Sequence, residues 1–300
     1  MQTNHLLSEN KEQNFGAAKI EIAGITTNTI IGCYPHERIA PQQIIIDLSI
    51  SLYLLNWLQP DDLATTIDYD GLTNFIQQEV SSTNYQLLES LSKYLSNKIL
   101  ERYPIVNCVQ LRLTKPAICG VIAKNISVSY ECKRKFKVAL ALGSNCDLAQ
   151  QQIITAIEIL GDYVSNIQIG GFYETTPVGG IVQANFINTA ITGYTDLKPE
   201  ELLSKIKTIE KLMGKHEIIK NGPRMIDIDL ILFDNLVYQH NFLQIPHKFA
   251  HLRDFVLQPL FDIVPHWVHP VENKTISQLL VGLPKTEKSI LQKIEHYKNN

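Results

Sequence analysis

The chain has 300 residues, of which 45% are hydrophobic and 19% charged, with a formal net charge of −3. This composition is typical of a soluble globular protein with one large or two ordinary domains, and it provides no field to attract nucleic acid or an anionic membrane. No apolar stretch is long enough to span a bilayer. The five scattered cysteines form no C-x-x-C pair and indicate reduced thiols in a cytoplasmic protein.

The composition along the sequence predicts where its domains begin and end. Residues 1–18 are polar and mixed, without the basic start and apolar run of a secretory signal, so we expect a disordered tail. A short basic cluster between Glu131 and Lys137 separates two strand-like runs. We therefore expect two abutting domains, residues 19–134 and 137–300.

The first of these domains shows strand signals in pairs around a helical middle, with Asp68 as the cap of its first helix. Alternating apolar residues predict strands over 20–31, 43–54, 106–114 and 121–130, and helical spacing predicts helices over 69–80 and 87–103. The ββααββ order predicts an α+β domain with helices on one face of an antiparallel sheet. Because such a sheet has exposed edges, we expect it to associate into an oligomer.

The second domain shows an alternation of strands and helices. Its predicted elements are strand 138–142, helix 148–160, strand 164–173, strand 186–194, helix 199–213 and a strand over 226–233. This β-α-β-β-α-β order is that of a ferredoxin-like sandwich.

The last strand of this pattern carries two acidic residues. Asp227 and Asp229 alternate with large aliphatic residues, so both side chains point to the same face. Neighbouring carboxylates repel each other unless a cation lies between them, and oxygen ligands suit Mg²⁺, which accompanies nucleotide phosphates. Arg224, behind a Gly-Pro turn, suits phosphate. A solvated acidic edge strand is the alternative for a bare D-x-D pattern, but the flanking Gly-Pro-Arg favours a metal–nucleotide site.

Several motifs occur in a fixed order between residues 137 and 285. They are Gly143-Ser144-Asn145, Phe172-Tyr173-Glu174-Thr175 with Pro177, Asn185-Phe186-Ile187-Asn188, the aspartate strand behind Gly222-Pro223-Arg224, and Pro246-His247. Together they resemble 6-hydroxymethyl-7,8-dihydropterin pyrophosphokinase. The resemblance implies transfer of pyrophosphate from ATP to the hydroxymethyl group of the pterin, with release of AMP. It also implies two Mg²⁺ ions, held by Asp227 and Asp229, which neutralise the phosphates during the transfer.

The same resemblance implies roles for single residues. Arg224, Arg253 and His247 would cradle the ATP phosphates, and Glu210 would face the nucleotide. Asn188 would hydrogen-bond the amide edge of the pterin. The implied pocket residues are Thr175, Pro177 and Val178, with Phe255 stacked on the ring and Tyr173 as a further wall.

The loop before Gly-Pro-Arg departs from the pyrophosphokinase pattern. This family usually carries several arginines and an aromatic residue there, whereas this sequence has Lys215, Lys220 and Asn221. We expect both lysines to contact ATP, because lysine keeps the charge although it lacks the bidentate fork of arginine. The departure bears on loop closure, and the implied reaction is the same.

A second set of motifs lies between residues 19 and 132. It consists of Ile31-Gly32-Cys33-Tyr34-Pro35-His36-Glu37-Arg38 with Gln42 or Gln43, Thr66-Ile67-Asp68-Tyr69, Leu87-Leu88-Glu89 and Thr114-Lys115-Pro116. Together they resemble dihydroneopterin aldolase. The resemblance implies a tunnelling fold (T-fold), a homo-oligomer of four or eight subunits, and a site between subunits to which Tyr69 and Glu89 come from different subunits. It implies no cofactor.

The chemistry of this domain follows from its substrate. Dihydroneopterin has its own electron sink, the ring C=N bond; protonation of that nitrogen lets a carbon–carbon bond of the substituent break to an enamine and glycolaldehyde. A proton must leave the hydroxyl of that substituent, and another must reach the enamine carbon. Lys115 and Tyr69 are suitable proton carriers, Glu89 would anchor the guanidine-like edge, and Glu37 would contact the site. Leu88 and Ile67 would bind the substrate.

The product of the aldolase reaction is the substrate of the pyrophosphokinase, so the two resemblances predict a bifunctional enzyme that acts on pterins and ATP. One alternative keeps the fold of the first domain but makes it an epimerase of dihydroneopterin or its triphosphate, through the same retro-aldol intermediate. A second alternative makes it a non-catalytic oligomerisation scaffold. The presence together of Glu37, Tyr69, Glu89 and Lys115 argues against the scaffold.

Overall fold

The computed structural model describes residues 18–52, 63, 66–116, 123–177, 183–214, 223–240, 242–284, 286 and 288–295. The protein divides into two compact units, Met1–Arg134 and Lys135–Asn300. Each unit has its own hydrophobic core. None of the helices described combines the length and the apolar character needed to span a bilayer.

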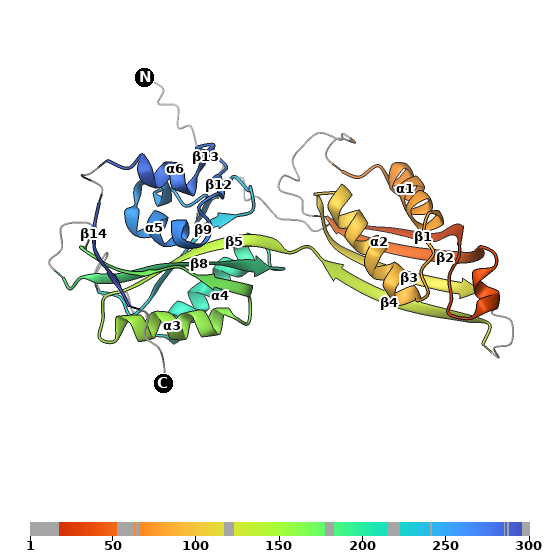
Figure 1. Cartoon of the computed structure of the whole chain (residues 1–300), viewed down its shortest axis with the longest axis horizontal. Coiled ribbons are helices and arrows are strands. Elements are labelled where there is room, and N and C mark those ends of the chain that lie inside the picture. The colour runs from red at the N-terminus through yellow and green to blue at the C-terminus, as the bar shows by residue number, and fades with distance from the viewer. Residues whose placement is uncertain are drawn as a thin grey trace, which may run out of the picture. The chain divides into compact units, whose positions relative to one another are not determined.

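The first unit contains a four-stranded antiparallel sheet with two helices on one face (Figure 1). Its elements in sequence order are β1 (Ala18–Thr29), η1 (Pro35–Arg38), β2 (Gln42–Leu52), α1 (Tyr69–Ser81), α2 (Leu88–Arg102), β3 (Val106–Pro116) and β4 (Asn125–Lys133). The strand order is β1-β2-β3-β4, so β1 and β4 are the edges. The predicted ββααββ order is confirmed.

The predicted patterns explain how this unit is packed. Every second residue of β2, from Ile44 to Leu52, is buried, and these side chains meet the apolar stripe of α2, which includes Leu91, Leu95 and Ile99. Asp68 caps α1 as expected, since its side chain accepts a hydrogen bond of 3.1 Å from the amide of Asp70. The alternate residues of the strand and the apolar stripe of the helix therefore form one core.

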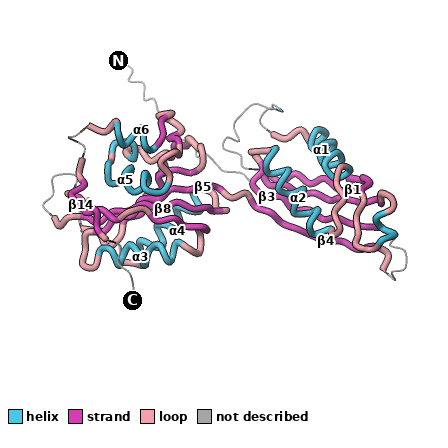
Figure 2. The backbone as a smooth tube through the Cα atoms, viewed as in Figure 1, coloured by secondary structure: helices cyan, strands magenta, loops and turns pink. Residues whose placement is uncertain are grey.

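The second unit has three layers, a β-sheet with helices on both of its faces (Figures 1 and 2). Its main elements are β5 (Phe136–Ser144), α3 (Ala149–Leu160), β6 (Ser165–Ile169), β7 (Phe172–Thr175), β8 (Phe186–Thr195), α4 (Pro199–Leu212), β9 (Asp227–Phe233), α5 (Asp254–Ile263), α6 (Ile276–Val281) and β14 (Ile290–Ile294). Shorter elements are β10 (Tyr238–His240), β11 (Leu243–Ile245), η3 (Ala250–Leu252), β12 (Val268–His269) and β13 (Lys274–Thr275).

The sheet of this unit has the order β14-β7-β8-β5-β9, and β6 also pairs with β8. Its four strands β7-β8-β5-β9, with α3 and α4 on one face, form the predicted ferredoxin-like sandwich. Helices α5 and α6 cover the other face, where they pack on small and aliphatic residues such as Ala139, Ala190 and Ile231. The α+β class is confirmed for both units.

The structure corrects one strand of the sequence prediction. The single strand expected over 164–173 is two strands, β6 and β7, separated at Gly170-Gly171. A Cβ atom on Gly170 would lie 2.3 Å from the carbonyl oxygen of Pro259 in α5, so only a glycine fits where this helix packs against the break between the two strands. Helix α5, which makes this contact, and strand β14, which extends the sheet beside β7, were not predicted from the sequence.

Candidate active site

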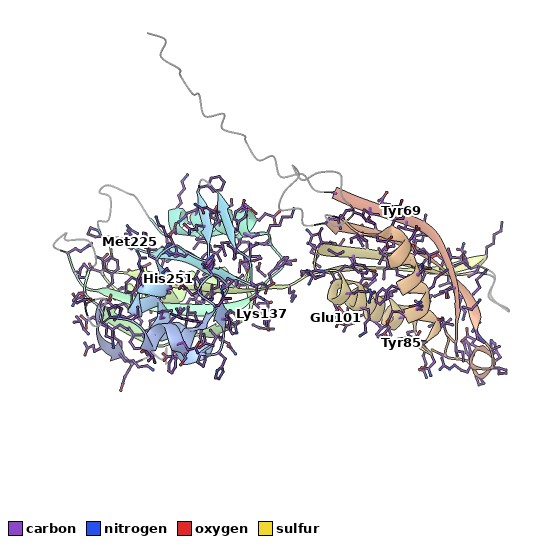
Figure 3. The ribbon with its side chains drawn as sticks, turned by 90° about the horizontal axis from the view of Figure 1, so that it is seen from above. Tyr69, Tyr85, Glu101, Lys137, Met225 and His251 are labelled. Atoms are coloured by element: carbon purple, nitrogen blue, oxygen red, sulfur yellow. The ribbon has the colours of Figure 1, made fainter. Side chains whose placement is uncertain are left out.

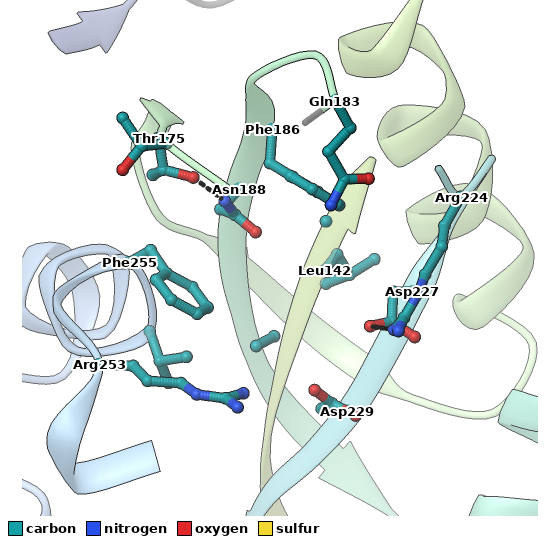
Figure 4. A pocket seen from close by; sticks show the side chains of 14 residues that line it. Leu142, Thr175, Gln183, Phe186, Asn188, Arg224, Asp227, Asp229, Arg253 and Phe255 are labelled. Carbon is teal, nitrogen blue, oxygen red and sulfur yellow. Dashed lines mark hydrogen bonds and ion pairs between the residues drawn. The ribbon is translucent and has the colours of Figure 1, made fainter. Parts of the chain in front are cut away.

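A cavity of about 260 Å³ opens at one end of the sheet of the second unit, between β5, β7, β8, β9 and the start of α5 (Figure 4). It brings together seven residues predicted from the sequence: Thr175, Asn188, Arg224, Asp227, Asp229, Arg253 and Phe255. The acidic residues lie on one side of the cavity, and Asn188, Thr175 and Phe255 lie on the other (Figure 4).

Strand β9 positions both aspartates on the accessible face of the sheet. Asp227 and Asp229 pair with Gly143 and Ala141 of β5, while Ile228 between them is fully buried on the opposite face. Arg224 donates a hydrogen bond of 2.5 Å to the carboxylate of Asp227. Burial, followed by the negative charge of Asp227, raises the pKa of Asp229. The site therefore concentrates negative charge that a cation would stabilise.

The opposite side of the cavity offers a polar edge and aromatic faces. The amide nitrogen of Asn188 donates a hydrogen bond of 2.7 Å to the hydroxyl of Thr175, which fixes the orientation of the Asn188 side chain. Gly143 makes room for it, because a Cβ atom there would lie 2.5 Å from Asn188 Oδ1. Phe255 and Phe186 both line the cavity.

Phe186 takes the place that the sequence interpretation gave to Tyr173. The hydroxyl of Tyr173 donates a hydrogen bond of 2.8 Å to Asp262 in α5, and Tyr173 does not line the cavity. Burial and the Asp262 carboxylate together raise the pKa of Tyr173 to about 12. The motif that contains Asn188 also contained Phe186, but the alternation along a strand could not show which aromatic residue lines the cavity.

Asn145 is a second residue whose role was missed. Its side-chain amide nitrogen donates a hydrogen bond of 3.0 Å to Gln183, and its oxygen accepts one of 2.8 Å from the backbone amide of Arg224. Gln183 and Arg224 both line the cavity. The side chain of Asn145 therefore joins the two segments that enclose the site, and the Gly143-Ser144-Asn145 motif was the signal for it.

Glu210 and His247 lie beside the cavity and do not line it. Glu210 is 2% exposed and accepts hydrogen bonds from the amide of Ile228 at 2.9 Å and from Lys207 at 2.8 Å. Burial lowers the pKa of His247, an effect that the nearby Asp229 opposes. The contact of both residues with ATP stays a prediction.

Other predicted residues of this site cannot be placed in the cavity. Pro177 follows β7, one residue beyond Thr176, which does line it. Val178, Lys215 and Lys220 lie outside the described residues.

In the first unit, the structure brings Lys115 and Glu37 together. The Lys115 ammonium donates hydrogen bonds to the Glu37 carboxylate and to the carbonyl oxygen of Ile31, the latter at 3.2 Å. Their side chains are 8% and 11% exposed, so Lys115 is not an ordinary surface lysine at a strand end. The hydrogen bond from Lys115 is the main cause that lowers the pKa of Glu37.

Two polar side chains hold the loop that carries Glu37 by hydrogen bonds to backbone carbonyls, and a glycine leaves room for its carboxylate. Gln42 donates hydrogen bonds of 2.8 and 2.9 Å to the carbonyls of Ile31 and Glu37. Arg38 reaches the carbonyl of Tyr85, just before α2, at 2.9 Å. Gly32 has a φ of +133°, and a Cβ atom on it would lie 2.2 Å from the Glu37 carboxylate. These contacts place the Glu37 loop beside the start of α2.

Leu88 and Glu89 lie at this end of the unit, in the first turn of α2, with Leu88 buried and Glu89 exposed. Tyr69 and Ile67 lie at the other end, since α1 begins at Tyr69 and runs for 13 residues, about 20 Å, before the connection to α2. Figure 3 shows Tyr69 and Tyr85 well apart in this unit. One protomer therefore groups Lys115, Glu37 and Glu89 but separates Tyr69, which is 59% exposed, from them.

The second unit is similar to known pyrophosphokinases. A family profile described as 7,8-dihydro-6-hydroxymethylpterin-pyrophosphokinase matches residues 139–265. The 2-amino-4-hydroxy-6-hydroxymethyldihydropteridine pyrophosphokinase of Aquifex aeolicus (strain VF5) is 40% identical over 141 residues, 47% of this chain and 88% of that protein. This chain belongs to the 6-hydroxymethyl-7,8-dihydropterin pyrophosphokinase family.

An aldolase domain precedes the pyrophosphokinase domain, since a profile described as dihydroneopterin aldolase matches residues 20–131. The folic acid synthesis protein FOL1 of Dictyostelium discoideum is 30% identical over 293 residues, which cover 89% of this chain and 44% of that protein. This chain thus spans less than half the length of that relative. A solved structure of E. coli dihydroneopterin aldolase in complex with neopterin is 22% identical, covers 38% of this chain and 98% of that chain, and has a TM-score of 0.35.

Proposed function

We propose that the protein catalyses two consecutive reactions, cleavage of 7,8-dihydroneopterin and pyrophosphorylation of the resulting 6-hydroxymethyl-7,8-dihydropterin. The observation that carries the second activity is that Asp227 and Asp229 line the same cavity as Asn188 and Phe255. A flat, polar-edged ligand on one side would then present its hydroxyl to a phosphate-binding region on the other. Phosphoryl-type transfer needs this positioning more than it needs covalent chemistry.

The pterin would bind between the aromatic rings of Phe255 and Phe186, which both line the cavity. Asn188, held by Thr175, would offer its side-chain amide to the pyrimidinone edge of the ring. Aromatic faces combined with fixed polar groups are a usual lining of a small-molecule site. Thr176 also lines the cavity and Pro177 follows it, and contacts of Thr175, Pro177 and Val178 with the pterin are part of the proposal.

The residues at the acidic end suit a magnesium–nucleotide site. The described residues contain no group of three or more His, Cys, Asp or Glu side chains that could hold a metal, so a bound ion would need ligands beyond Asp227 and Asp229. Mg²⁺ is usually held by one or two carboxylates together with phosphate oxygens and water, and the burial of Asp229 beside the negative charge of Asp227 would favour a bound cation. When bound with ATP, two Mg²⁺ ions would supply charge neutralisation on the phosphates.

Cationic side chains would hold and orient the phosphates. Arg224 and Arg253 line the cavity, and Arg253 lies over the ring of Phe255 at 5.5 Å. A guanidinium is always charged and binds phosphate through two parallel hydrogen bonds. The roles of His247, Glu210, Lys215 and Lys220 toward ATP belong to the same proposal.

For the first unit, the buried Lys115–Glu37 pair supports the aldolase over the scaffold alternative. A buried ion pair at the end of a strand is costly and weak evidence for stability, so a catalytic role is a better reason for it. We propose that Lys115, held by Glu37, donates the proton that the ring system takes up and that Tyr69 assists proton transfer through water. Glu89 would bind the amino-pyrimidine edge.

Because one protomer separates Tyr69 from Lys115, the complete aldolase site requires two protomers. β1 and β4 are the outer strands of the sheet that the structure describes, and a strand at the edge of a sheet is where a second protomer can associate. We therefore propose a homo-oligomer through the aldolase domain, a tetramer or an octamer.

The test is incubation of the protein with dihydroneopterin, ATP and magnesium, with identification of all products by mass. We expect glycolaldehyde, AMP and the pterin pyrophosphate. Asp227→Asn should abolish AMP formation and leave glycolaldehyde release intact, while Lys115→Ala should do the reverse when hydroxymethyldihydropterin is supplied. An epimer of dihydroneopterin in place of glycolaldehyde would assign the first unit to epimerisation.

A further inference from the structure

Asp254 is a buried carboxylate between two residues of the candidate pterin pocket. It is the first residue of α5 and 3% exposed, while its neighbours Arg253 and Phe255 both line the cavity. A buried carboxylate requires hydrogen-bond donors to replace water. The donors that it finds come from residues more than thirty positions further along the sequence.

Asp254 accepts three hydrogen bonds from the start of β14. The backbone amides of Ser289 and Ile290 donate to its Oδ2 atom at 2.8 and 2.9 Å, and the hydroxyl of Ser289 donates to its Oδ1 atom at 2.7 Å. Hydrogen bonds to an ionised group in a low-dielectric setting are stronger and more directional than neutral ones. The start of α5 is thereby tied to the C-terminal strand.

The same segment is tied to the opposite wall of the cavity. The carbonyl oxygen of Ser289 accepts a hydrogen bond of 3.0 Å from the amide of Thr176, which lines the cavity. Ile290 pairs with Thr175 in the antiparallel ladder of β14 and β7. Thr175 in turn fixes Asn188. Ser289 therefore connects the wall that carries Phe255 with the wall that carries Asn188.

We propose that Asp254, Ser289 and Thr176, here termed the clasp, position the two walls of the pterin pocket relative to each other. The inference rests on the proposed function of that pocket. The clasp is not needed to dock α5 as such, because Val256, Leu257 and Leu260 of this helix are buried in the core. What it fixes is the cavity end of the helix, and small displacements there would disturb a stacked ligand strongly.

Helix α5 supplies a matched control at its other end. Asp262 accepts hydrogen bonds of 2.9 Å from the amide of Gly171 and 2.8 Å from the hydroxyl of Tyr173, and none of these three residues lines the cavity. Asp262→Ala should thus weaken the anchoring of α5 in a similar way without moving the pocket walls. A difference between Asp254 and Asp262 variants isolates positioning from stability.

The test is binding of 6-hydroxymethylpterin to the full-length protein, measured by its fluorescence, with thermal unfolding of each variant recorded beside it. Asp254→Ala should raise the dissociation constant about tenfold or more, Ser289→Ala should raise it less because the backbone amides still donate, and Asp262→Ala should leave it unchanged. Equal binding by Asp254→Ala and the wild type would overturn the clasp. A wild-type protein that bound no pterin would overturn the proposed function and the clasp with it.

A second measurement uses the wild-type protein and does not depend on a variant that folds. Coupling between two sites is reciprocal, so if the clasp orders the pocket, an occupied pocket must stabilise the clasp. Hydrogen exchange at the amides of Ser289 and Ile290 should slow when 6-hydroxymethylpterin is added, while the amide of Gly171 should change little. Unchanged exchange at Ser289 and Ile290 with saturating pterin would contradict the proposal.

Discussion

The carboxylate of Glu210 accepts a hydrogen bond of 2.9 Å from the backbone amide of Ile228, the residue between Asp227 and Asp229. The amide belongs to β9, whose other side pairs with β5, so Glu210 occupies the edge that the sheet leaves open. Lys207, one turn earlier on α4, forms an ion pair with this buried carboxylate, with 2.8 Å between Nζ of Lys207 and Oε2 of Glu210. Glu210 thus fixes the backbone of β9 between the two aspartates.

We therefore predict that Glu210→Ala weakens magnesium use, while Glu210→Gln largely preserves it because the amide oxygen still accepts the hydrogen bond. A buried amide left without an acceptor costs about 1 to 3 kcal/mol. The magnesium concentration for half-maximal AMP formation and the dissociation constant of Mn²⁺, measured by electron paramagnetic resonance, should both rise in Glu210→Ala. Glu201→Ala, which removes an exposed cap at the start of the same helix, is the control.

A Gln variant as defective as the Ala variant would change this interpretation. It would mean that the charge of Glu210 is required, as expected for the direct nucleotide contact that the family resemblance implies.

Gly32 provides a prediction about the aldolase domain. A methyl group there would collide with the Glu37 carboxylate, at 2.2 Å, in addition to the strain of a positive φ. Gly32→Ala should therefore lower glycolaldehyde release about tenfold or more, because Glu37 loses its place beside Lys115. Gly24→Ala has a positive φ of +76° but open space around it, so it should lose some stability and keep its activity. Equal activity losses in the two variants would argue against the collision.

The Lys115–Glu37 pair makes the stability of the first unit depend on pH. Lys115 lowers the pKa of Glu37 in the folded state. The ion pair therefore contributes fully to the free energy of unfolding above the pKa of unfolded glutamate, about 4.3, and this contribution is lost as the pH falls through the lower pKa of the folded state. We expect Glu37→Gln to cost about 2 kcal/mol at pH 7 and much less near pH 3. Urea unfolding of the wild type and of this variant at both pH values measures the difference.

An exposed lysine–glutamate pair in the same unit serves as the reference for this experiment. Lys98 and Glu101 lie 3.4 Å apart on α2 with side chains 40% and 69% exposed, and such pairs contribute little. Glu101→Gln should show no comparable pH dependence. If Glu37→Gln behaved in the same way, the pair with Lys115 would not be formed in solution.

Local patterns in the sequence were sufficient for most elements and for the acidic side of the site. Alternation along β9 placed Asp227 and Asp229 on one face, and helical spacing in α2 identified a stripe that is buried. These features depend on neighbours within a few residues, where geometry is fixed by the period of the element. The close approach of Pro259 to Gly170, at the break between β6 and β7, involves residues far apart in the sequence.

The same reason explains which features of the sites were missed. Nothing near Lys115 in the sequence indicates that it is buried, since its partner Glu37 is 78 residues away. Phe186 and Tyr173 both occur in motifs, but only Phe186 lines the cavity, because Tyr173 is hydrogen-bonded to Asp262 of α5, a helix that the sequence did not predict. Asp254 could be recognised only with Ser289 beside it.

The separation of Tyr69 from Lys115 leads to a prediction about subunits. If each aldolase site takes Tyr69 from one subunit and Lys115 from another, Tyr69→Phe and Lys115→Ala should each be nearly inactive as pure oligomers. Co-expressed, the two variants should form mixed oligomers in which some sites contain both native residues. Random mixing of equal amounts gives about one quarter of such sites, and glycolaldehyde release should recover to that order.

A matched pair of variants defines the background for this complementation. Lys115→Ala and Glu37→Gln affect residues of the same protomer and the same ion pair, so their mixture should contain no site with both residues native. Size-exclusion chromatography with light scattering should show the same oligomer in every sample, and AMP formation should stay constant as an internal standard. Absence of recovery by the Tyr69 and Lys115 mixture would place the whole aldolase site in one protomer and contradict the shared site. Recovery by the Lys115 and Glu37 mixture would instead contradict the supply of these two residues by the same protomer.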